Sequence, residues 1–165
     1  MVPGNERYEG RLYRALKKEY SLNPLSGRGA ELHGGRFNPK GTPALYTSLQ
    51  PETAMLEVRR AGGIGQFVMI GYRADQHPIF DAGNNVAMAH YGMSTERLAD
   101  TGWFAAMMNS QPVPTHDFAM ELINDGYAGL LVRSFVRGAT RENLNLVLWQ
   151  WNVGNNKLKV ESKDG

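Results

Sequence analysis

The chain has 165 residues, of which 42% are hydrophobic and 21% are charged, and its formal net charge is +2. This length allows one sizeable hydrophobic core, and the apolar content excludes intrinsic disorder. The sequence contains no cysteine, which excludes disulfide scaffolds, thiolate nucleophiles and cysteine-ligated zinc. Because the basic residues are scattered and form no stripe, neither nucleic acid nor another polyanion is expected as the main partner.

The sequence shows no targeting or membrane signal. Its first twenty residues are rich in charged side chains and contain no apolar stretch of the signal-peptide type. No run approaches the roughly 18 apolar residues that a membrane helix needs. We therefore expect a cytoplasmic protein without a membrane partner. We expect a single domain over residues 1–165, with a core over about 12–151 and a polar C-terminal tail over 155–165.

The first half of the chain predicts two strands, a long loop and a helix. In chain order these are a strand within 11–16, a turn-rich segment over 21–43, a strand over 44–48 and a helix over 51–61. The glycines and prolines of the turn-rich segment exclude a long helix there, and a loop of this length is more often a binding loop than a plain connection. An early proline and an acid begin the helix, and two glycines end it.

The second half predicts three further strands and a helical segment. These are a strand over 67–72, a mostly helical stretch over 84–126 with breaks near 92–94 and 112–114, and strands over 129–136 and 144–151. Strands and helices do not alternate regularly, as they would in a series of βαβ units. The order therefore predicts an α+β fold with a largely antiparallel sheet.

The helix predicted over 51–61 carries a carboxylate on its apolar face. At 100° per residue, that face is formed by Ala54, Val58 and Ala61. Glu57 falls in the middle of it, and a carboxylate there is costly to bury unless a partner or a function uses it. The structural alternatives are a rotated helix with Glu57 at the rim, or a buried ion pair.

A serine occupies a similar position in the strand predicted over 129–136. Alternation places Ser134 on the same face as Leu130, Val132 and Val136. A hydroxyl among branched aliphatic side chains needs a hydrogen-bond partner. For this serine alone, a neighbouring backbone carbonyl is the simpler partner, and a functional role is the alternative.

The segment over 33–38 reads His-Gly-Gly-Arg-Phe-Asn. Its glycines let the backbone approach a ligand closely, and Arg36 offers a planar fork suited to phosphate or carboxylate. The segment is neither a P-loop nor a dinucleotide-binding glycine motif, because Pro39 and Pro43 exclude the helix that would have to follow. The histidines lack the spacing of metal ligands and no Gly-x-Ser-x-Gly motif occurs, so neither a metal nor a serine hydrolase is expected.

Taken together, these segments resemble the RES domain, a family named after an arginine, a glutamate and a serine. The resemblance covers about 12–149 and rests on three blocks. The first runs from Leu25 to Ser48 and contains Gly-Gly-Arg-Phe-Asn and Leu-Tyr-Thr-Ser. The second is Ala-Met-Leu-Glu-Val over 54–58, and the third is Leu-Leu-Val-Arg-Ser over 130–134. The residues that match the family name are Arg36, Glu57 and Ser134.

Within the family, the chain is most similar to the ParT-like toxins. Phe37 stands where many members have tryptophan. Two residues, Asn143 and Asn145, compete to match an asparagine that the toxins carry near the last strand. The helical stretch over 84–126 matches loosely, which leaves the identity of the acceptor open.

The resemblance implies a fold similar to ADP-ribosyltransferase toxins, with split antiparallel sheets and flanking helices. It also implies NAD as the substrate without a metal, ADP-ribose transfer to a protein, and a complex with a helix-turn-helix-type antitoxin. Water or inorganic phosphate is the alternative acceptor, which would make the protein a NAD glycohydrolase or phosphorylase. A non-catalytic module that binds NAD or ADP-ribose is the alternative from another class.

The resemblance also assigns roles to individual residues. Glu57 would stabilise positive charge on the ribose, Arg36 would bind the pyrophosphate or a ribose, and Ser134 would hold the ribose or Glu57. Further contacts to NAD are expected from His33, Asn38, Tyr46 and Thr47. Among these, Tyr46 would stack on the nicotinamide and shield the site from water.

Overall fold

The computed structural model describes residues 6–60 and 65–164. Within them, seven strands form one sheet in the order β4-β5-β6-β2-β1-β3-β7. The strands are β1 (Tyr8–Lys17), β2 (Leu45–Ser48), β3 (Phe67–Gln76), β4 (Ile79–Asp81), β5 (Gly129–Arg133), β6 (Leu144–Leu148) and β7 (Lys157–Asp164). Only β4 and β5 run parallel; the other neighbours are antiparallel. The predicted α+β class is confirmed.

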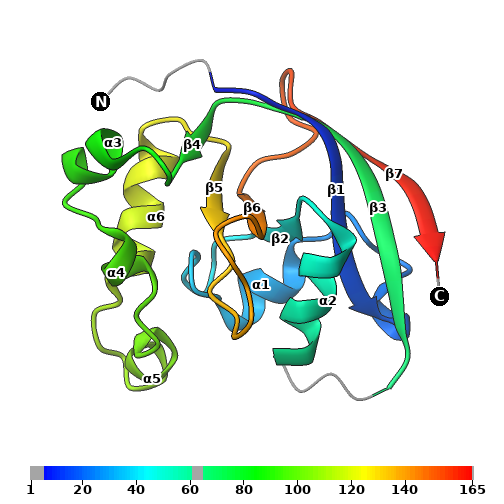
Figure 1. The fold of residues 1–165 in the computed structure, drawn as a ribbon, viewed down its shortest axis with the longest axis horizontal. Helices are drawn as coiled ribbons and strands as arrows, with labels where there is room; N and C mark the ends of the chain where they lie inside the picture. Colours follow the sequence, from blue (N-terminus) through cyan, green and yellow to red (C-terminus); the bar gives the residue numbers. More distant parts are fainter. Residues whose placement is uncertain (1–5, 61–64, 165) are drawn as a thin grey trace.

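The helices lie mainly at one end of the sheet. They are η1 (Lys18–Tyr20), α1 (Arg28–His33), α2 (Pro51–Arg60), α3 (Asn85–His90), α4 (Thr95–Leu98), α5 (Trp103–Met108) and α6 (Pro114–Asn124). Figure 1 shows α3 to α6 gathered near β4 and β5, with β1, β3 and β7 at the opposite end. Between these two ends, α2 packs against β1 and β2.

The sheet is nearly divided between β1 and β2. These strands share a single register pair, Tyr13 with Ser48, whereas β1 pairs with β3 along its whole length. The expected split of the sheet corresponds to this joint, which still connects the two parts. Beyond the joint β1 and β2 no longer pair, and a pocket opens between Leu16 on β1 and Tyr46 on β2.

The two faces of the sheet are covered by separate hydrophobic clusters. The cluster on the side of α3 to α6 includes Phe80, Phe118, Leu122, Leu130 and Val147. The cluster on the other side includes Leu12, Leu45, Ile70, Leu146, Leu148 and Leu158. Successive residues of β6 thus alternate between the clusters, and this burial on both faces fixes the strand register.

The C-terminal segment differs from its prediction. Residues expected to form a polar tail make β7, which pairs with β3, and Leu158 on β7 is buried in the second cluster. The prediction of a tail was wrong because strand pairing uses backbone groups, so an edge strand can carry polar side chains at most positions. The helix predicted over 51–61 is confirmed as α2, while Ala61, Gly62 and Gly63 lie outside the described residues.

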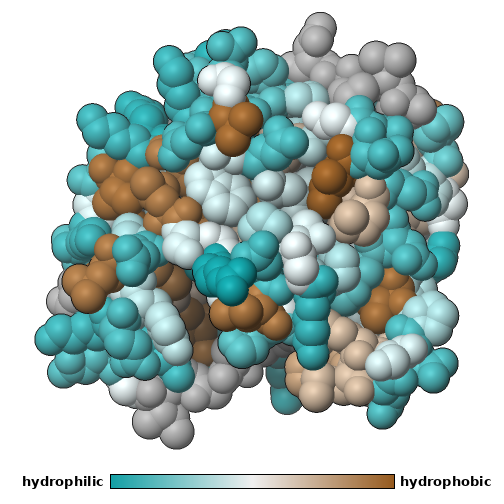
Figure 2. Space-filling model, turned by 180° about the vertical axis from the view of Figure 1, so that it is seen from behind, coloured by the Kyte–Doolittle hydropathy of each residue, from teal (hydrophilic) through white to brown (hydrophobic). Residues whose placement is uncertain are grey.

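The surface is that of an ordinary folded domain where it is described. No helix in the described ranges is long and apolar enough to cross a membrane. On the face in Figure 2, hydrophobic residues form separate patches between hydrophilic ones. Patches of this kind are normal on folded proteins, and they give no argument for an extended apolar partner on this face.

Candidate active site

Two adjoining pockets lie beside α2 in the middle of the molecule. The smaller has a volume of about 210 Å³ and alone contains Tyr13, Ala15, Leu16, Ala54 and Val58. The larger has a volume of about 390 Å³ and alone contains Gly34, Arg36, Trp103, Arg133 and Phe135. Both pockets are lined by Arg14, Tyr46, Glu57 and Asn145. Glu57 therefore stands at the junction of the two pockets.

The helix α2 directs Glu57 toward this junction. Ala54, one turn earlier, is buried, whereas Glu57 and Val58 are partly buried and line the smaller pocket. The apolar face predicted for this helix does point into the protein. The carboxylate escapes full burial because a pocket opens next to it, not because the helix is rotated toward solvent.

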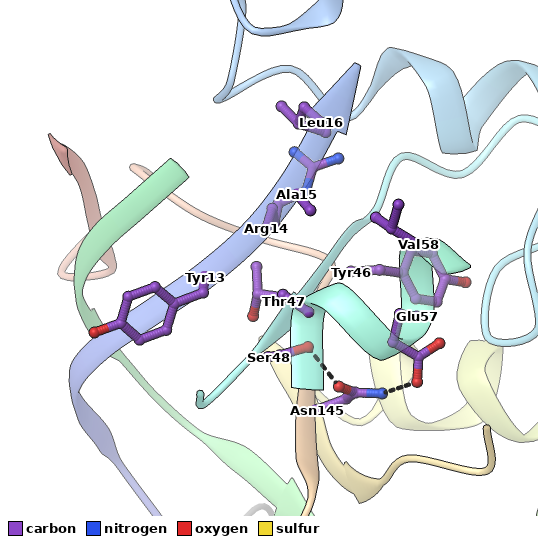
Figure 3. Close-up of a pocket in the computed structure, with 11 residues that line it drawn as sticks. Tyr13, Arg14, Ala15, Leu16, Tyr46, Thr47, Ser48, Glu57, Val58 and Asn145 are labelled. Atoms are coloured by element: carbon purple, nitrogen blue, oxygen red, sulfur yellow. Dashed lines mark hydrogen bonds between the residues drawn. The ribbon is translucent and has the colours of Figure 1, made fainter. Parts of the chain in front are cut away.

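Two neutral donors fix the carboxylate of Glu57. The Ser134 hydroxyl and the Asn145 side-chain amide both donate to Oε1 of Glu57, the amide at 3.0 Å. Ser48 in turn donates to Oδ1 of Asn145 at 2.7 Å (Figure 3). Within the described residues, Oε2 of Glu57 has no hydrogen-bond partner. The carboxylate is thus held by one oxygen and presents the other to a ligand.

Ser134 is completely buried directly after β5. It shares its face with Leu130, Val132 and Val136, which are buried as the alternation predicts. Its hydroxyl also accepts a hydrogen bond from the Val136 N–H at 3.3 Å. The partner of the hydroxyl as a donor is Glu57 and not a backbone carbonyl, so the serine belongs to the site.

Arg36 reaches the same site from the loop between α1 and β2. Its guanidinium Nη1 donates to the carbonyl oxygens of Leu98 and Asp100, each at 2.8 Å. The guanidinium carbon also lies 5.8 Å from the ring centroid of Trp103 and 5.5 Å from that of Phe135. Arg36 therefore connects the binding loop to the helical end of the molecule while it lines the larger pocket.

Tyr46 on β2 forms a wall shared by both pockets, with its ring beside Glu57 (Figure 3). Its hydroxyl donates to Oδ1 of Asn38 at 2.6 Å and accepts from the Phe37 N–H at 3.0 Å. Burial raises the pKa of Tyr46, against smaller opposing effects of the Phe37 N–H and of Arg36. The tyrosine is consequently neutral at physiological pH, and its ring is fixed from behind.

The RES domain family model matches residues 11–163. The chain belongs to the RES domain family. Two relatives named "Toxin Res" are similar to it, one from Yersinia enterocolitica (44% identical over 46 residues) and one from Photorhabdus laumondii (43% over 47 residues). Each match covers 28% of this chain and 30% of the relative. The family is thus shown by the domain match, which spans nearly the whole chain.

In this RES domain, the two asparagines near β6 have different surroundings. Asn145 donates to Glu57 and lines both pockets. Asn143 instead donates to the Thr53 hydroxyl at 3.0 Å and accepts from the Thr140 N–H at 2.9 Å. The site asparagine is therefore Asn145, and Asn143 stabilises the turn before β6.

Three further residues expected to contact NAD are Asn38, Thr47 and His33. Asn38 is completely buried and donates to the carbonyl oxygens of Ala30 and Thr42, so its role is to shape the loop. Thr47 is buried and its hydroxyl donates to the Leu146 carbonyl at 2.7 Å. Direct contact of either residue with a ligand stays a prediction, and Thr47 is among the residues that line the smaller pocket.

His33 is the third. It is exposed at the end of α1 and lines a third pocket with Arg28 and Leu32, and Arg14 lines this pocket as well. His33 does not line either pocket that Glu57 lines. The expected contact of His33 with NAD stays a prediction.

Sequence reasoning also missed several residues of the site. Arg14 on β1 lines both pockets, and Arg133 and Trp103 line the larger one. Arg14 donates to the Pro24 carbonyl at 3.3 Å, and the guanidinium of Arg133 lies 5.9 Å from the Phe135 ring centroid. The sequence around Arg14 and Arg133 shows no unusual pattern that would mark them as site residues. Their place in the site depends on which strands become neighbours in the sheet.

Proposed function

We propose that this RES domain cleaves the nicotinamide–ribose bond of NAD and transfers ADP-ribose to a protein acceptor. The observation that carries the proposal is the carboxylate of Glu57, which two neutral donors hold at the junction of two pockets. The larger pocket adds three guanidinium groups to this single carboxylate, those of Arg14, Arg36 and Arg133. A pocket with this charge suits the dianionic diphosphate of a dinucleotide.

The chemistry requires a negative group beside the reacting carbon. When the bond between ribose C1′ and the nicotinamide nitrogen breaks, the electron pair stays on nitrogen and the ribose acquires positive charge. The free oxygen of Glu57 would stabilise that charge, which an unpositioned carboxylate in water does poorly. The acceptor atom then bonds to C1′ and releases its proton to Glu57 or to solvent.

The other residues of the site hold the reactants in place. Ser134 and Asn145 orient the carboxylate, so it needs no rearrangement during the reaction. The arginines bind the pyrophosphate through charge-assisted hydrogen bonds. The neutral ring of Tyr46, beside Glu57, forms a stacking surface for the nicotinamide and excludes water from one side.

The names of the two relatives support a biological role for this activity. Both are called "Toxin Res", and each shares a segment of 46 or 47 residues with this chain. We infer that this protein is the toxin of a bacterial toxin–antitoxin system, acts on NAD in the cytoplasm, and is neutralised by a helix-turn-helix-type antitoxin in a complex.

The first test measures free nicotinamide after incubation of the protein with NAD. Glu57→Gln keeps the shape of the side chain and removes its charge, so nicotinamide release should fall about 100-fold or more. Glu52→Gln, at an exposed acid on the same helix, is the matched control and should retain the activity of the unchanged protein. Equal rates for Glu57→Gln and wild type would reject the assignment of Glu57.

The second test identifies the acceptor. NAD labelled in its adenylate moiety is incubated with the protein and a cell lysate, with and without inorganic phosphate. Label on a protein supports ADP-ribose transfer, whereas label only in small molecules shows hydrolysis or phosphorolysis. Saturable NAD binding without nicotinamide release would overturn the enzymatic proposal in favour of a binding module.

A further inference from the structure

We infer that Trp103 and Phe135 form the adenine-binding end of the site, with Arg36 and Arg133 on the diphosphate, and that the nicotinamide enters the smaller pocket. This inference rests on the proposed function, and it fixes the direction in which NAD lies. It rests on two differences between the pockets, their charge and their aromatic content. It also rests on the contacts that hold Trp103 in place.

The charges of the pockets differ by two guanidinium groups. The smaller pocket is lined by Arg14 and Glu57, so one positive group balances one negative group. The larger pocket contains the same pair and adds Arg36 and Arg133. The nicotinamide ring of NAD carries a positive charge and the diphosphate carries two negative charges. Electrostatic attraction therefore favours the ADP half in the larger pocket and the nicotinamide in the smaller one.

The aromatic rings show the same preference. Trp103 and Phe135 line only the larger pocket, whose wall also includes Phe37. The guanidinium carbon of Arg36 is 5.8 Å and 5.5 Å from the two ring centroids, near the outer limit of about 6 Å for a cation–π contact. Arg36 thus does not stack tightly on either ring. A purine base stacks well on such rings, because every base offers a flat π-face.

Trp103 is also held in a defined place. It begins α5, shortly after Leu98 at the end of α4 and Asp100 in the following loop, whose carbonyls accept hydrogen bonds from Arg36. Its ring packs edge-on against Phe104, with 5.7 Å between centroids and an interplanar angle of 83°. The residue that binds the diphosphate therefore also positions the ring that would bind the base.

The smaller pocket suits the remaining half of the dinucleotide. Its own lining is largely apolar and includes Ala15, Leu16, Ala54 and Val58, and the ring of Tyr46 closes one side. A pocket in which one positive and one negative side chain balance accepts the flat nicotinamide ring against its apolar wall and places its bond to ribose next to Glu57. The released nicotinamide is neutral, and no second guanidinium is needed there.

The kinetic test compares three variants in α5. Trp103→Leu should raise the KM for NAD roughly tenfold, in line with the loss of one base–aromatic stack, and change kcat by less than about threefold. Trp103→Phe keeps a ring and should stay close to wild type. Met108→Leu changes an exposed residue of the same helix that lines neither pocket, and it is the control. An unchanged KM in Trp103→Leu would overturn the inference while leaving the proposed function intact.

Competition experiments test the orientation of NAD between the two pockets directly. ADP should inhibit NAD cleavage competitively, and Trp103→Leu should raise its inhibition constant about tenfold. Nicotinamide should inhibit both proteins equally. If Trp103→Leu raised the inhibition constant of nicotinamide and left that of ADP unchanged, the nicotinamide would lie on Trp103 and the inference would be overturned. Failure of ADP to inhibit the wild type would overturn it as well.

A binding measurement separates this inference from the proposed activity. Titration with ADP-ribose should quench part of the tryptophan fluorescence in the wild type, and Trp103→Phe should remove that part while Trp149 and Trp151 still emit. Such quenching in a protein that releases no nicotinamide would reject catalysis and retain the subsite. Absence of quenching in a protein that does cleave NAD would reject the subsite and retain catalysis.

Discussion

At the level of single residues, the site depends on a chain of three hydrogen bonds. Ser48 donates to Asn145, and Asn145 and Ser134 both donate to Glu57. These four residues come from β2, β6, the segment after β5, and α2. Since the side-chain oxygen of Asn145 accepts from Ser48, its amide nitrogen must face Glu57. Ser48 therefore sets the orientation in which the asparagine can serve the carboxylate.

The two asparagines near β6 allow a matched comparison. Asn145→Ala removes one of the two donors to Glu57, and a hydrogen bond to a charged group contributes about 1.5–3 kcal/mol. We expect kcat for nicotinamide release to fall by roughly 10- to 100-fold, measured with folded protein at saturating NAD. The cause is a carboxylate that is no longer fixed beside the ribose.

Asn143→Ala is the control for this prediction. It removes the bonds to Thr53 and Thr140 and should lower the free energy of unfolding by about 1 kcal/mol, with kcat unchanged. A loss of turnover in Asn143→Ala equal to that in Asn145→Ala would show that the region acts through stability alone, and the distinction between the two residues would be wrong.

At the level of elements, the loop between α1 and β2 is shaped by close packing around Gly35. Its N–H donates to the Asn38 carbonyl at 2.9 Å, and its own carbonyl lies 2.6 Å from Nε2 of the buried His116. A Cβ atom at this position would lie 2.5 Å from the Tyr46 hydroxyl and 2.8 Å from Oδ1 of Asn38. Glycine is thus needed here for space, and the loop that carries Arg36 is held against β2 and α6.

Gly35→Ala should disturb the loop and the site together. Overpacking of this kind costs about 1–3 kcal/mol, so the melting temperature should fall. Because Tyr46 and Arg36 both shift when the loop moves, kcat/KM for NAD should fall at least about tenfold. Thermal unfolding and nicotinamide release on the same preparation would measure both effects.

Gly29→Ala provides the comparison within the preceding helix. A Cβ atom there would meet nothing within 4 Å, and Gly29 lies in α1. Alanine is the better helix former, by up to about 1 kcal/mol, so this variant should be as stable as wild type or slightly more stable, with normal turnover. If Gly35→Ala behaved in the same way, the close packing around the loop would have no functional role.

At the scale of the whole molecule, some features were predictable from local pattern and others required the topology. Glu57 and Ser134 could be found because a polar side chain interrupts an apolar face. Arg14 and Trp103 could not, because they reach the site only after β1 joins β2 at one pair and Arg36 binds the segment that precedes α5. The strands β4 and β7 were missed since one is three residues long and the other is mostly polar.

Buried tyrosines make the stability of the whole domain sensitive to alkaline pH. Burial raises the pKa of Tyr46 and of Tyr72 above the ordinary value of about 10. Their hydroxyls donate, each at 2.6 Å, to Asn38 and to the Pro24 carbonyl. Above about pH 10 the unfolded chain releases these protons while the folded protein keeps them. The stabilisation is therefore complete below that pH and is lost as the pH rises through the folded pKa values.

The free energy of unfolding should accordingly decrease above about pH 10, by up to about 1.4 kcal/mol per pH unit for each such tyrosine. Urea unfolding at several values between pH 8 and 11 measures this slope. Tyr46→Phe removes one titrating group and should reduce the slope by that amount, even though it costs stability at pH 8. Tyr20→Phe, at an exposed ring, is the control for the substitution itself and should leave the free energy of unfolding at pH 8 unchanged. If Tyr46→Phe kept the wild-type slope, the tyrosine beside Glu57 would not be held in its neutral form by the fold.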